Sequence, residues 1–264
     1  MKKYLVIGNP ISHSLSPELH NHWIKQNGLN AMYDKKKLTH NELENLILDF
    51  KRGNINGINV TIPFKNAIIP YLDQLSDEAK TTQSVNTVYL KDKKTIGHNT
   101  DIEGFENAIK KINFDFNNKR ILILGAGGVV PSIIYASMKM GSSKIFISNR
   151  TKEKAEKVKN IFNNIKLVDW GEIPDFDVII NATSLGLNKE DKIDLDFTKR
   201  GKNKLFYDLI YNPNETDFLN IGKKLGHKTE NGKLMFIYQA FLAFKLWHDV
   251  EPTINSETFK LLDQ

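Results

Sequence analysis

Two serines near the start of the chain are the first residues whose spacing could do chemistry. Ser14 and Ser16 flank one leucine, and Pro17 follows, as proline does at the first position of many helices. Hydroxyl groups at a helix N-terminus can cap the helix or bind a carboxylate in the field of its dipole. Capping is the usual role for a serine such as Ser16, but the pair makes a carboxylate site a competing hypothesis.

A lysine follows the short apolar strand predicted over 58–62. Asn59 and Thr61 would lie on one face of this strand, because side chains alternate along it. Lys65 comes just past Pro63, which stops the strand. Most lysines are solvated surface groups. A lysine placed directly after an apolar strand, however, can lie in a cleft and exchange a proton with a substrate.

Another amide and a carboxylate follow at Asn86 and Asp101. Asn86 belongs to a strand predicted over 85–90, and Asp101 precedes a helix predicted over 102–112, for which it is also a good N-cap. Hydroxyls, amides, a lysine and a carboxylate together suit a small polar substrate. They are the candidate catalytic and binding groups of the first part of the chain.

A glycine-rich turn follows the apolar run at 121–124 and opens a helix that continues to about Met140. Glycine at Gly125 permits the tight turn, and glycine at Gly127 lets the backbone approach a pyrophosphate beside the free N–H groups of the helix. The third position of the dinucleotide fingerprint is Val130 rather than glycine or alanine. The alternative is an ordinary glycine turn in an α/β sheet.

The end of the next strand, predicted over 144–148, indicates which nicotinamide cofactor the loop would bind. Sheets that bind NAD usually place a carboxylate there, whereas an arginine accommodates the 2′-phosphate of NADP. This strand ends in Ser148-Asn149-Arg150 and has no carboxylate. The sequence therefore favours NADP, unless Arg150 merely solvates a loop.

The elements that position these residues change character along the chain. Up to about residue 100, short strands, helices and a strand–turn–strand pair predict an α/β region with a mixed sheet. Beyond that point apolar strands alternate regularly with helices, which predicts right-handed crossovers around a parallel sheet. These later strands are expected at 121–124, 144–148, 177–180 and 204–208.

Composition excludes several other classes of protein. The chain has 264 residues, which suits two modest domains, and it contains no cysteine, so disulfides and thiolate sites are absent. The net charge of +6 comes largely from lysines in polar stretches, without the basic patch of a nucleic-acid-binding module. Neither a signal peptide nor a membrane-spanning run is recognisable. We expect a cytoplasmic protein without a metal site, because no histidine has the spacing of a metal ligand.

Taken together, the motifs resemble those of the shikimate dehydrogenase family, in the family's order and over nearly the whole chain. The resemblance is carried by Ile7 to Pro17, Asn59 to Lys65, Val85-Asn86-Thr87, Asn99-Thr100-Asp101, Gly125 to Gly128, Asn149-Arg150-Thr151, Asn181 to Ser184, Tyr211-Asn212-Pro213, Glu215-Thr216 and Gln239-Ala240. It implies a discontinuous substrate domain, 1–100 plus 234–264, and a Rossmann-like NADP domain, 101–233. It also implies the reversible reduction of 3-dehydroshikimate to shikimate by NADPH.

The resemblance further implies a role for each matching residue. Lys65 and Asp101 would be the catalytic pair. The substrate would be bound by Ser14, Ser16, Asn59, Thr61, Asn86, Tyr211 and Gln239. The cofactor would be bound by Asp77, Gly125, Ala126, Gly127, Gly128, Val129, Asn149, Arg150, Thr151, Lys154, Thr183, Leu209 and Gly232. Asp77 matches a weaker position and is as good a helix cap.

Departures from the family pattern are few, and three alternatives remain open. Gln83-Ser84 and Val129-Val130-Pro131 replace smaller residues, but neither change touches the catalytic pair. The nearest alternative is a quinate/shikimate dehydrogenase that uses NAD; the others are an inactive relative and a nucleic-acid binder. The family includes monomers and homodimers, so the resemblance leaves both open.

Overall fold

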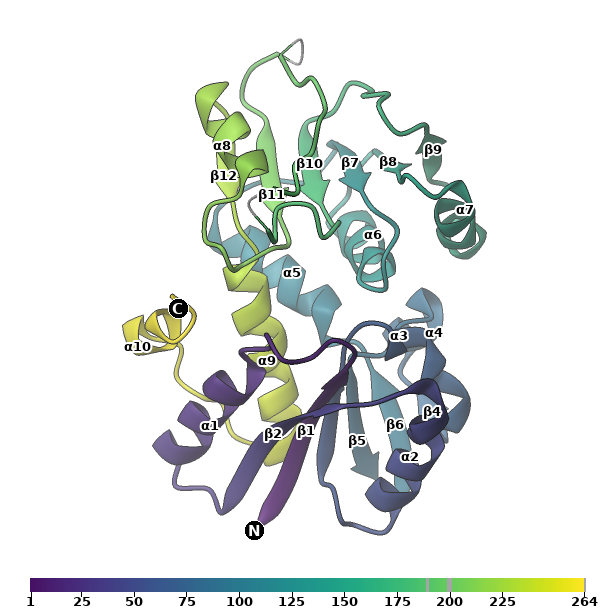
Figure 1. Ribbon diagram of the computed structural model, residues 1–264, viewed down its shortest axis with the longest axis vertical. Helices are drawn as coiled ribbons and strands as arrows, with labels where there is room; N and C mark the ends of the chain where they lie inside the picture. Colours follow the sequence, from purple (N-terminus) through teal and green to yellow (C-terminus); the bar gives the residue numbers. More distant parts are fainter. Residues whose placement is uncertain (189, 199–200, 264) are drawn as a thin grey trace. The chain divides into compact units, whose positions relative to one another are not determined.

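The computed structural model describes residues 1–188, 190–198 and 201–263. The chain divides into two compact units (Figure 1). The first comprises Met1–Gly104 and Ile237–Leu261, and the second comprises Phe105–Phe236 and Leu262–Gln264. Helices α5 (Thr100–Lys111) and α9 (Lys233–His248) carry the chain from one unit to the other. Among the described residues, no helix is both long and apolar enough to cross a membrane.

The first unit is built on a mixed six-stranded sheet in the order β2-β1-β3-β5-β6-β4. Its strands are β1 (Lys2–Gly8), β2 (Ala31–Lys37), β3 (Gly57–Val60), β4 (Gln74–Leu75), β5 (Thr87–Lys91) and β6 (Lys94–His98). The β3–β5 and β5–β6 pairs are antiparallel and the other pairs are parallel. The predicted mixed sheet is confirmed.

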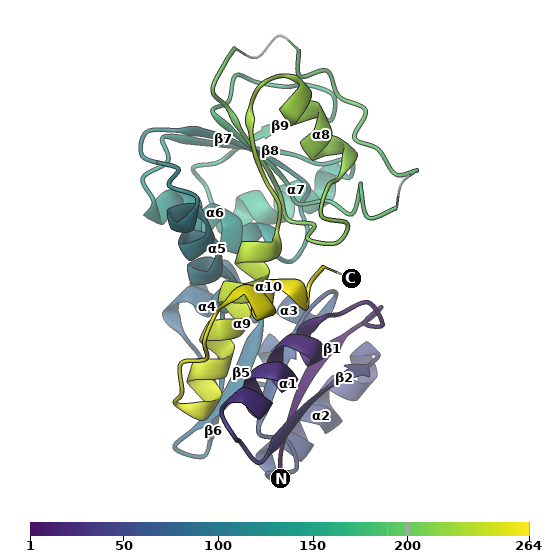
Figure 2. The ribbon, with the colours of Figure 1, turned by 90° about the vertical axis from the view of Figure 1, so that its left-hand side faces the viewer.

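Helices and short 3₁₀ turns complete the first unit, together with the parts of α5 and α9 that belong to it. The helices are α1 (Ser16–Gln26), α2 (Leu43–Lys51), α3 (Phe64–Ala67), α4 (Asp77–Thr82) and α10 (Ser256–Lys260), and the 3₁₀ turns are η1 (His40–Glu42) and η2 (Ile69–Tyr71). Helix α1 packs beside β2, as Figure 2 shows, and the Asn21 side chain exchanges two hydrogen bonds with the backbone of Tyr33. The sequence did not predict edge strand β2, because its C-terminal half consists of Asp34 and three lysines. Such a composition is typical of a loop, but it also protects an exposed sheet edge from pairing with another chain.

The second unit contains a fully parallel six-stranded sheet in the order β12-β11-β10-β7-β8-β9. Its strands are β7 (Arg120–Leu124), β8 (Lys144–Ser148), β9 (Lys166–Val168), β10 (Val178–Asn181), β11 (Leu205–Asp208) and β12 (Lys228–Glu230). Its helices, beside α5 and α9, are α6 (Val130–Lys139), α7 (Lys152–Ile161) and α8 (Asp217–Lys224). This is the doubly wound order of dinucleotide-binding folds, and the predicted Rossmann-like sheet is confirmed.

The order of the second sheet places its topological switch point between β7 and β10. In doubly wound sheets, ligands bind beyond the carboxyl ends of the strands at this point. The apolar residues of both central strands are buried, with Ile121 to Ile123 and Val178 to Ile180 at 0% exposure, as strands covered on both faces require. The loops after β7 and β10 are therefore the expected ligand-binding loops of this unit.

Strand β3 ends two residues earlier than the apolar pattern predicted. Thr61 still donates its N–H to the Ile7 carbonyl, but Pro63 has no N–H to continue the ladder, and Phe64 donates back to Thr61 as α3 begins. Thr61 therefore lies just beyond the strand that carries Asn59. Lys65, which follows Pro63 as expected, lies in α3.

The junction between β4 and β6 gives a prediction for stability. Asp73 accepts hydrogen bonds from the backbone and hydroxyl of Thr95 and pairs with Lys51, and these contacts, led by the Lys51 ammonium, lower the pKa of Asp73 to about 2. A carboxylate whose pKa falls on folding stabilises the protein above its unfolded pKa and loses that effect as the pH falls toward 2. Because Asp73 is partly exposed, we expect Asp73→Asn to lower the free energy of unfolding by only about 1 kcal/mol at pH 7. Urea unfolding from pH 7 to pH 2 should show this difference shrinking below pH 4, and a constant difference would contradict the prediction.

Candidate active site

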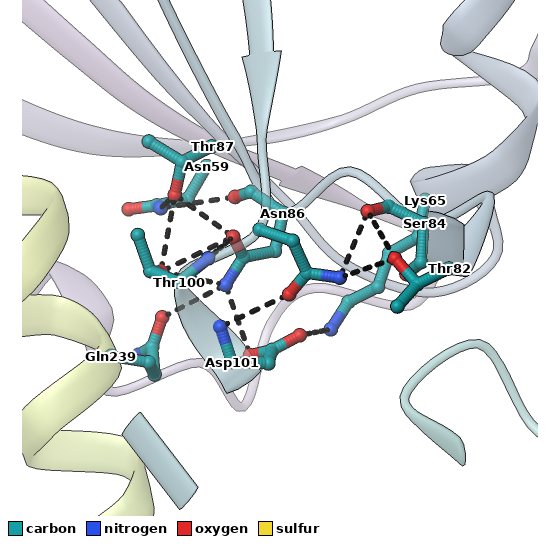
Figure 3. Close-up of polar contacts among 10 residues, drawn as sticks. Asn59, Lys65, Thr82, Ser84, Asn86, Thr87, Thr100, Asp101 and Gln239 are labelled. Carbon is teal, nitrogen blue, oxygen red and sulfur yellow. Dashed lines mark hydrogen bonds and ion pairs between the residues drawn. The ribbon is translucent and has the colours of Figure 1, made fainter. Parts of the chain in front are cut away.

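A buried ion pair lies at the carboxyl end of β3 in the first unit (Figure 3). Lys65 and Asp101 occupy the first turns of α3 and α5, and the lysine Nζ lies 2.5 Å from the Asp101 Oδ2 atom. Only 12% of the lysine side chain and 7% of the aspartate side chain are exposed. Sequence reasoning singled out both residues, and the fold joins them across 36 positions of the chain.

The other oxygen of Asp101 is held by an amide. Asn86 donates from Nδ2 to Asp101 Oδ1 at 2.9 Å and lies 3.5 Å from the Gln239 Oε1 atom of α9. The Oδ1 atom of the same Asn86 amide accepts the Thr100 backbone N–H at 2.8 Å. Asp101 therefore does not cap α5, the alternative that composition left open, because it lies inside the helix with its carboxylate turned toward Lys65 and Asn86.

Asn59 is fixed from three directions beside this network. Its Nδ2 donates to the Asn86 backbone carbonyl and to the Thr87 hydroxyl, each at 3.1 Å. Its Oδ1 accepts a hydrogen bond from the Tyr33 hydroxyl at 2.7 Å. Burial raises the pKa of Tyr33 well above its usual value, so the hydroxyl keeps its proton for Asn59.

Tyr33 is a site residue that sequence reasoning missed. It lies on β2, the strand that was not recognised, and its ring stacks on buried His20 at a centroid distance of 4.2 Å. Burial lowers the pKa of His20 to about 3, so the imidazole is neutral. A single tyrosine between Met32 and Asp34 carries no local signal of this role, which depends on the pairing of β2 with β1.

The two serines lie at the start of α1 without capping it. Leu15 occupies the N-cap position, no side chain caps this helix, and the Ser14 hydroxyl accepts the Ser16 backbone N–H at 3.3 Å. The expectation that Ser16 caps the helix is therefore wrong, because the helix begins at Ser16 itself.

One predicted substrate residue belongs to the other unit. Tyr211 follows β11, and its ring packs on Phe236 at a centroid distance of 4.4 Å. The remaining substrate candidates, including Gln239, belong to the first unit. Among the described residues, no group of three or more potential ligand side chains could hold a metal ion.

The glycine-rich loop of the second unit fits a dinucleotide. Gly125, at φ +112°, packs so closely on the loop after β10 that a Cβ would lie 2.7 Å from the Ala182 carbonyl oxygen. A Cβ at Gly127 would meet nothing within 4 Å, so open space lies before the loop. Val129 is the N-cap of α6, and Val130 is fully buried, so the departure from the fingerprint is absorbed by the core. The loop also contains Ala126 and Gly128.

The other cofactor candidates follow neighbouring strands at the same edge of this sheet. Asn149, Arg150 and Thr151 follow β8, Lys154 lies in α7, Thr183 follows β10, Leu209 follows β11, and Gly232 precedes α9. The Asn149 side chain donates to the Thr151 carbonyl at 2.7 Å. A Cβ at Gly232 would lie 2.1 Å from the Leu209 carbonyl oxygen, so only glycine fits there.

Asp77 stands apart from the other cofactor candidates. It is exposed, belongs to the first unit, and is the first residue of α4. Its alternative role as the helix cap is wrong, because the Ser76 hydroxyl caps this helix by accepting the Ala79 N–H.

Two family models match the chain. A model described as the shikimate dehydrogenase substrate binding domain matches residues 6–88, and one described as shikimate / quinate 5-dehydrogenase matches residues 106–217. A protein of Pelagibacter ubique (strain HTCC1062) named shikimate dehydrogenase (NADP(+)) is 55% identical over 262 residues, which are 99% of each chain. The chain belongs to the shikimate dehydrogenase family.

Solved shikimate dehydrogenase structures share the fold over the whole chain. The crystal structure of shikimate dehydrogenase from Aquifex aeolicus has a TM-score of 0.88 at 38% identity and covers 99% of this chain and 97% of that one. Shikimate 5-dehydrogenase from Thermus thermophilus, solved in complex with NADP(H) and shikimate, has a TM-score of 0.89 at 30% identity, with 99% and 98% coverage. The predicted family is thus confirmed.

Proposed function

We propose that this chain catalyses the reversible NADPH-dependent reduction of 3-dehydroshikimate to shikimate, a step toward chorismate and the aromatic amino acids. The observation that carries the proposal is the buried Lys65–Asp101 pair, held by Asn86 in the unit that the substrate-binding family model matches. The names of the relatives, shikimate dehydrogenase (NADP(+)), agree with it. We infer a cytoplasmic enzyme that is a monomer or a homodimer, which analytical ultracentrifugation would distinguish.

The division of labour follows the two units. The predicted substrate domain, 1–100 plus 234–264, would supply Lys65 and the amides, and the predicted domain 101–233 would hold the cofactor; Asp101 begins that second range but belongs to the first compact unit. Ser14 and Ser16, at the N-terminus of α1, would bind the substrate carboxylate, and Tyr211, which follows β11, is the further candidate for the same group. Asn59, Thr61, Asn86 and Gln239 would bind the ring hydroxyls. The hydrogen bonds from the Tyr33 hydroxyl to Asn59 and from Asn59 to the Asn86 backbone carbonyl support this arrangement, because they fix the amides beside the ion pair.

The chemistry assigned to the ion pair is proton transfer. NADPH, when bound, supplies the hydride that reduces the ketone. The ketone oxygen then gains negative charge, and the Lys65 ammonium can donate a proton to it or neutralise it. Asp101 keeps the ammonium oriented while its other oxygen is held by Asn86. In the oxidation of shikimate the same pair receives the proton of the reacting hydroxyl.

The second unit fits NADP(H) through backbone and charge. The pyrophosphate would lie against Gly125 to Val129 at the N-terminus of α6, where N–H groups are free. Asn149, Arg150, Thr151 and Lys154 would bind the 2′-phosphate side, where no carboxylate ends β8. Thr183, Leu209 and Gly232 would lie at the nicotinamide end, with Asp77 as an outlying contact from the first unit.

An assay with four pairings tests the proposal. Shikimate and quinate are each offered with NADP⁺ and with NAD⁺, and formation of the reduced cofactor is followed by absorbance. Turnover confined to shikimate with NADP⁺ is the expected result. Comparable turnover of quinate, or a preference for NAD⁺, would favour the quinate/shikimate alternative, and no turnover in any pairing would indicate an inactive relative.

Tyr33→Phe should weaken substrate binding without abolishing catalysis. The change leaves the Asn59 Oδ1 atom without its buried partner, while the ring and its stacking on His20 remain. A lost hydrogen bond of this kind corresponds to a rise in KM for shikimate of about fivefold. Steady-state kinetics should show kcat within about twofold of the original, since Tyr33 contacts neither Lys65 nor Asp101 directly. A fall in kcat at unchanged KM would contradict the assigned role.

A further inference from the structure

A buried carboxylate that takes no part in the proton transfer ends strand β11. Asp208 is 0% exposed and accepts three hydrogen bonds. Its Oδ1 accepts from the Asn181 side chain and from the Ile210 backbone N–H, each at 3.0 Å, and its Oδ2 accepts the Thr216 hydroxyl at 2.6 Å. Burial of a carboxylate is unfavourable unless hydrogen-bond donors compensate for its lost hydration. This site therefore calls for a structural or functional explanation.

The first partner connects Asp208 to the loop after β10. The side-chain Oδ1 atom of Asn181 accepts two hydrogen bonds from Thr183, one from its backbone N–H at 3.0 Å and one from its hydroxyl at 2.7 Å. The Thr183 hydroxyl in turn accepts the Leu185 N–H at 3.0 Å. The rotamer and the backbone of Thr183 are thus set by an amide whose Nδ2 donates to Asp208 at 3.0 Å and to the Leu185 backbone carbonyl at 3.1 Å.

The second partner connects Asp208 to the chain that leads toward α9. Ile210 donates its N–H to Asp208, and its carbonyl accepts the Gly232 N–H at 3.0 Å. Leu209, between Asp208 and Ile210, donates its N–H to the Asn181 backbone carbonyl at 2.9 Å, and its own carbonyl is the group against which Gly232 packs. Asp208 therefore reaches Leu209 and Gly232 as directly as it reaches Thr183.

We propose that Asp208 is a positioning residue for the nicotinamide end of the cofactor site, acting through Asn181 and Ile210 to set Thr183, Leu209 and Gly232. The proposal rests on the proposed function, which places these three residues at that end. One carboxylate can hold all three because parallel strands β10 and β11 are neighbours and end at the same edge of the sheet.

The ionised form of Asp208 suits this role, because a carboxylate only accepts hydrogen bonds and all three partners donate. Burial raises the pKa of Asp208 to about 6, against the lowering effect of its hydrogen bonds to Thr216, Ile210 and Asn181. At pH 8 the group is therefore ionised, and binding measurements belong at that pH.

The competing explanation is purely structural. The Thr216 hydroxyl accepts the Leu219 N–H as the N-cap of α8 while it donates to Asp208, so Asp208 also supports that helix. Both explanations predict lower stability when Asp208 is changed. Only the positioning role predicts weaker cofactor binding at unchanged substrate binding.

The test compares Asp208→Ala with two matched variants in the full chain at pH 8. Asp208→Asn keeps an Oδ1 acceptor for Asn181 and Ile210 and turns its NH₂ toward Thr216, whose hydroxyl can accept. Thr216→Val removes the cap and its bond to Asp208 but leaves both arms toward the cofactor residues. The Kd of NADPH is measured by fluorescence titration, the Kd of shikimate by calorimetry, and Tm by thermal unfolding.

We expect Asp208→Ala to raise the Kd of NADPH about tenfold, as loss of two positioning hydrogen bonds implies, and to leave the Kd of shikimate within about twofold. Asp208→Asn should restore most of the affinity for NADPH. Thr216→Val should lower Tm without changing that affinity. If Asp208→Ala does not fold, Asn181→Ala interrupts the arm to Thr183 in its middle and should raise the Kd of NADPH similarly.

Other outcomes overturn one proposal or both. Unchanged NADPH affinity in Asp208→Ala, or in Asn181→Ala where that variant replaces it, would overturn the positioning role. An equal loss of affinity in Thr216→Val would also overturn it and favour the structural explanation. Failure of the unmodified protein to bind NADPH would overturn the proposed function, and this inference with it.

Discussion

Lys65→Met is expected to lower kcat for shikimate oxidation by about a thousandfold, within the range of general acid–base effects. Methionine preserves much of the side-chain volume, but it can neither take up the proton that the reacting hydroxyl loses nor neutralise the alkoxide that forms before the hydride leaves for NADP⁺. The KM for shikimate should change little, because the amides and serines assigned to substrate binding remain. Steady-state kinetics with saturating NADP⁺ would measure both constants.

Two further variants sharpen that result. Lys80→Met makes the same substitution at an exposed position of α4 and should leave kcat unchanged. Asp101→Asn keeps an acceptor for Asn86 but cannot balance the ammonium, and we expect kcat to fall about a hundredfold. If Lys65→Met retained more than a tenth of the original kcat, the assignment of Lys65 to proton transfer would be wrong.

Arg150→Gln should raise the KM for NADP⁺ about thirtyfold, the order expected for a lost charge-assisted contact with a phosphate. The KM for NAD⁺ should hardly move, because that cofactor has no 2′-phosphate. The ratio of kcat/KM for the two cofactors therefore falls mainly through NADP⁺. Arg150 is exposed directly after β8, so its guanidinium is accessible to a phosphate at this edge of the sheet.

Lys159→Gln provides the matched control for the arginine. It removes one exposed positive charge from the last turn of α7. That turn is farther along the chain from the end of β8 than Arg150 is. We expect the cofactor preference to stay as it was. An equal loss of NADP⁺ affinity in both variants would point to a general effect of charge rather than to a contact made by Arg150.

Local sequence patterns predicted the four central strands of the second unit and proposed the candidate groups of the site, but they did not indicate the edge strands β9 and β12. Apolar runs with glycine turns predicted the parallel sheet, because a strand buried on both faces must be apolar throughout. Gly125 is dictated by the backbone itself, through its positive φ and close packing on Ala182, whereas a Cβ at Gly127 would meet nothing within 4 Å, so that glycine is explained by the approach of a pyrophosphate. The sequence alone also shows that no carboxylate directly follows β8, which is the feature that favours NADP.

Hydrogen-bond partners distant in sequence were decided only by the tertiary structure. Serine and aspartate at helix starts carry the same local signal whether they cap the helix or not, so Ser16, Asp77 and Asp101 each allowed a capping role that the structure excludes. Tyr33 reaches Asn59 because β2 pairs with β1, and the lysine-rich sequence of β2 does not predict that pairing.

The sequence by itself determined the fold class, the family and the residue types that can move a proton or bind a phosphate, since these depend on periodicity and side-chain chemistry. The tertiary structure decided which of those groups meet. Lys65 and Asp101 lie 36 positions apart in the sequence, and Asn86 and Gln239 lie 153 apart. Contacts over such separations follow from strand order and helix packing, and no local pattern encodes them.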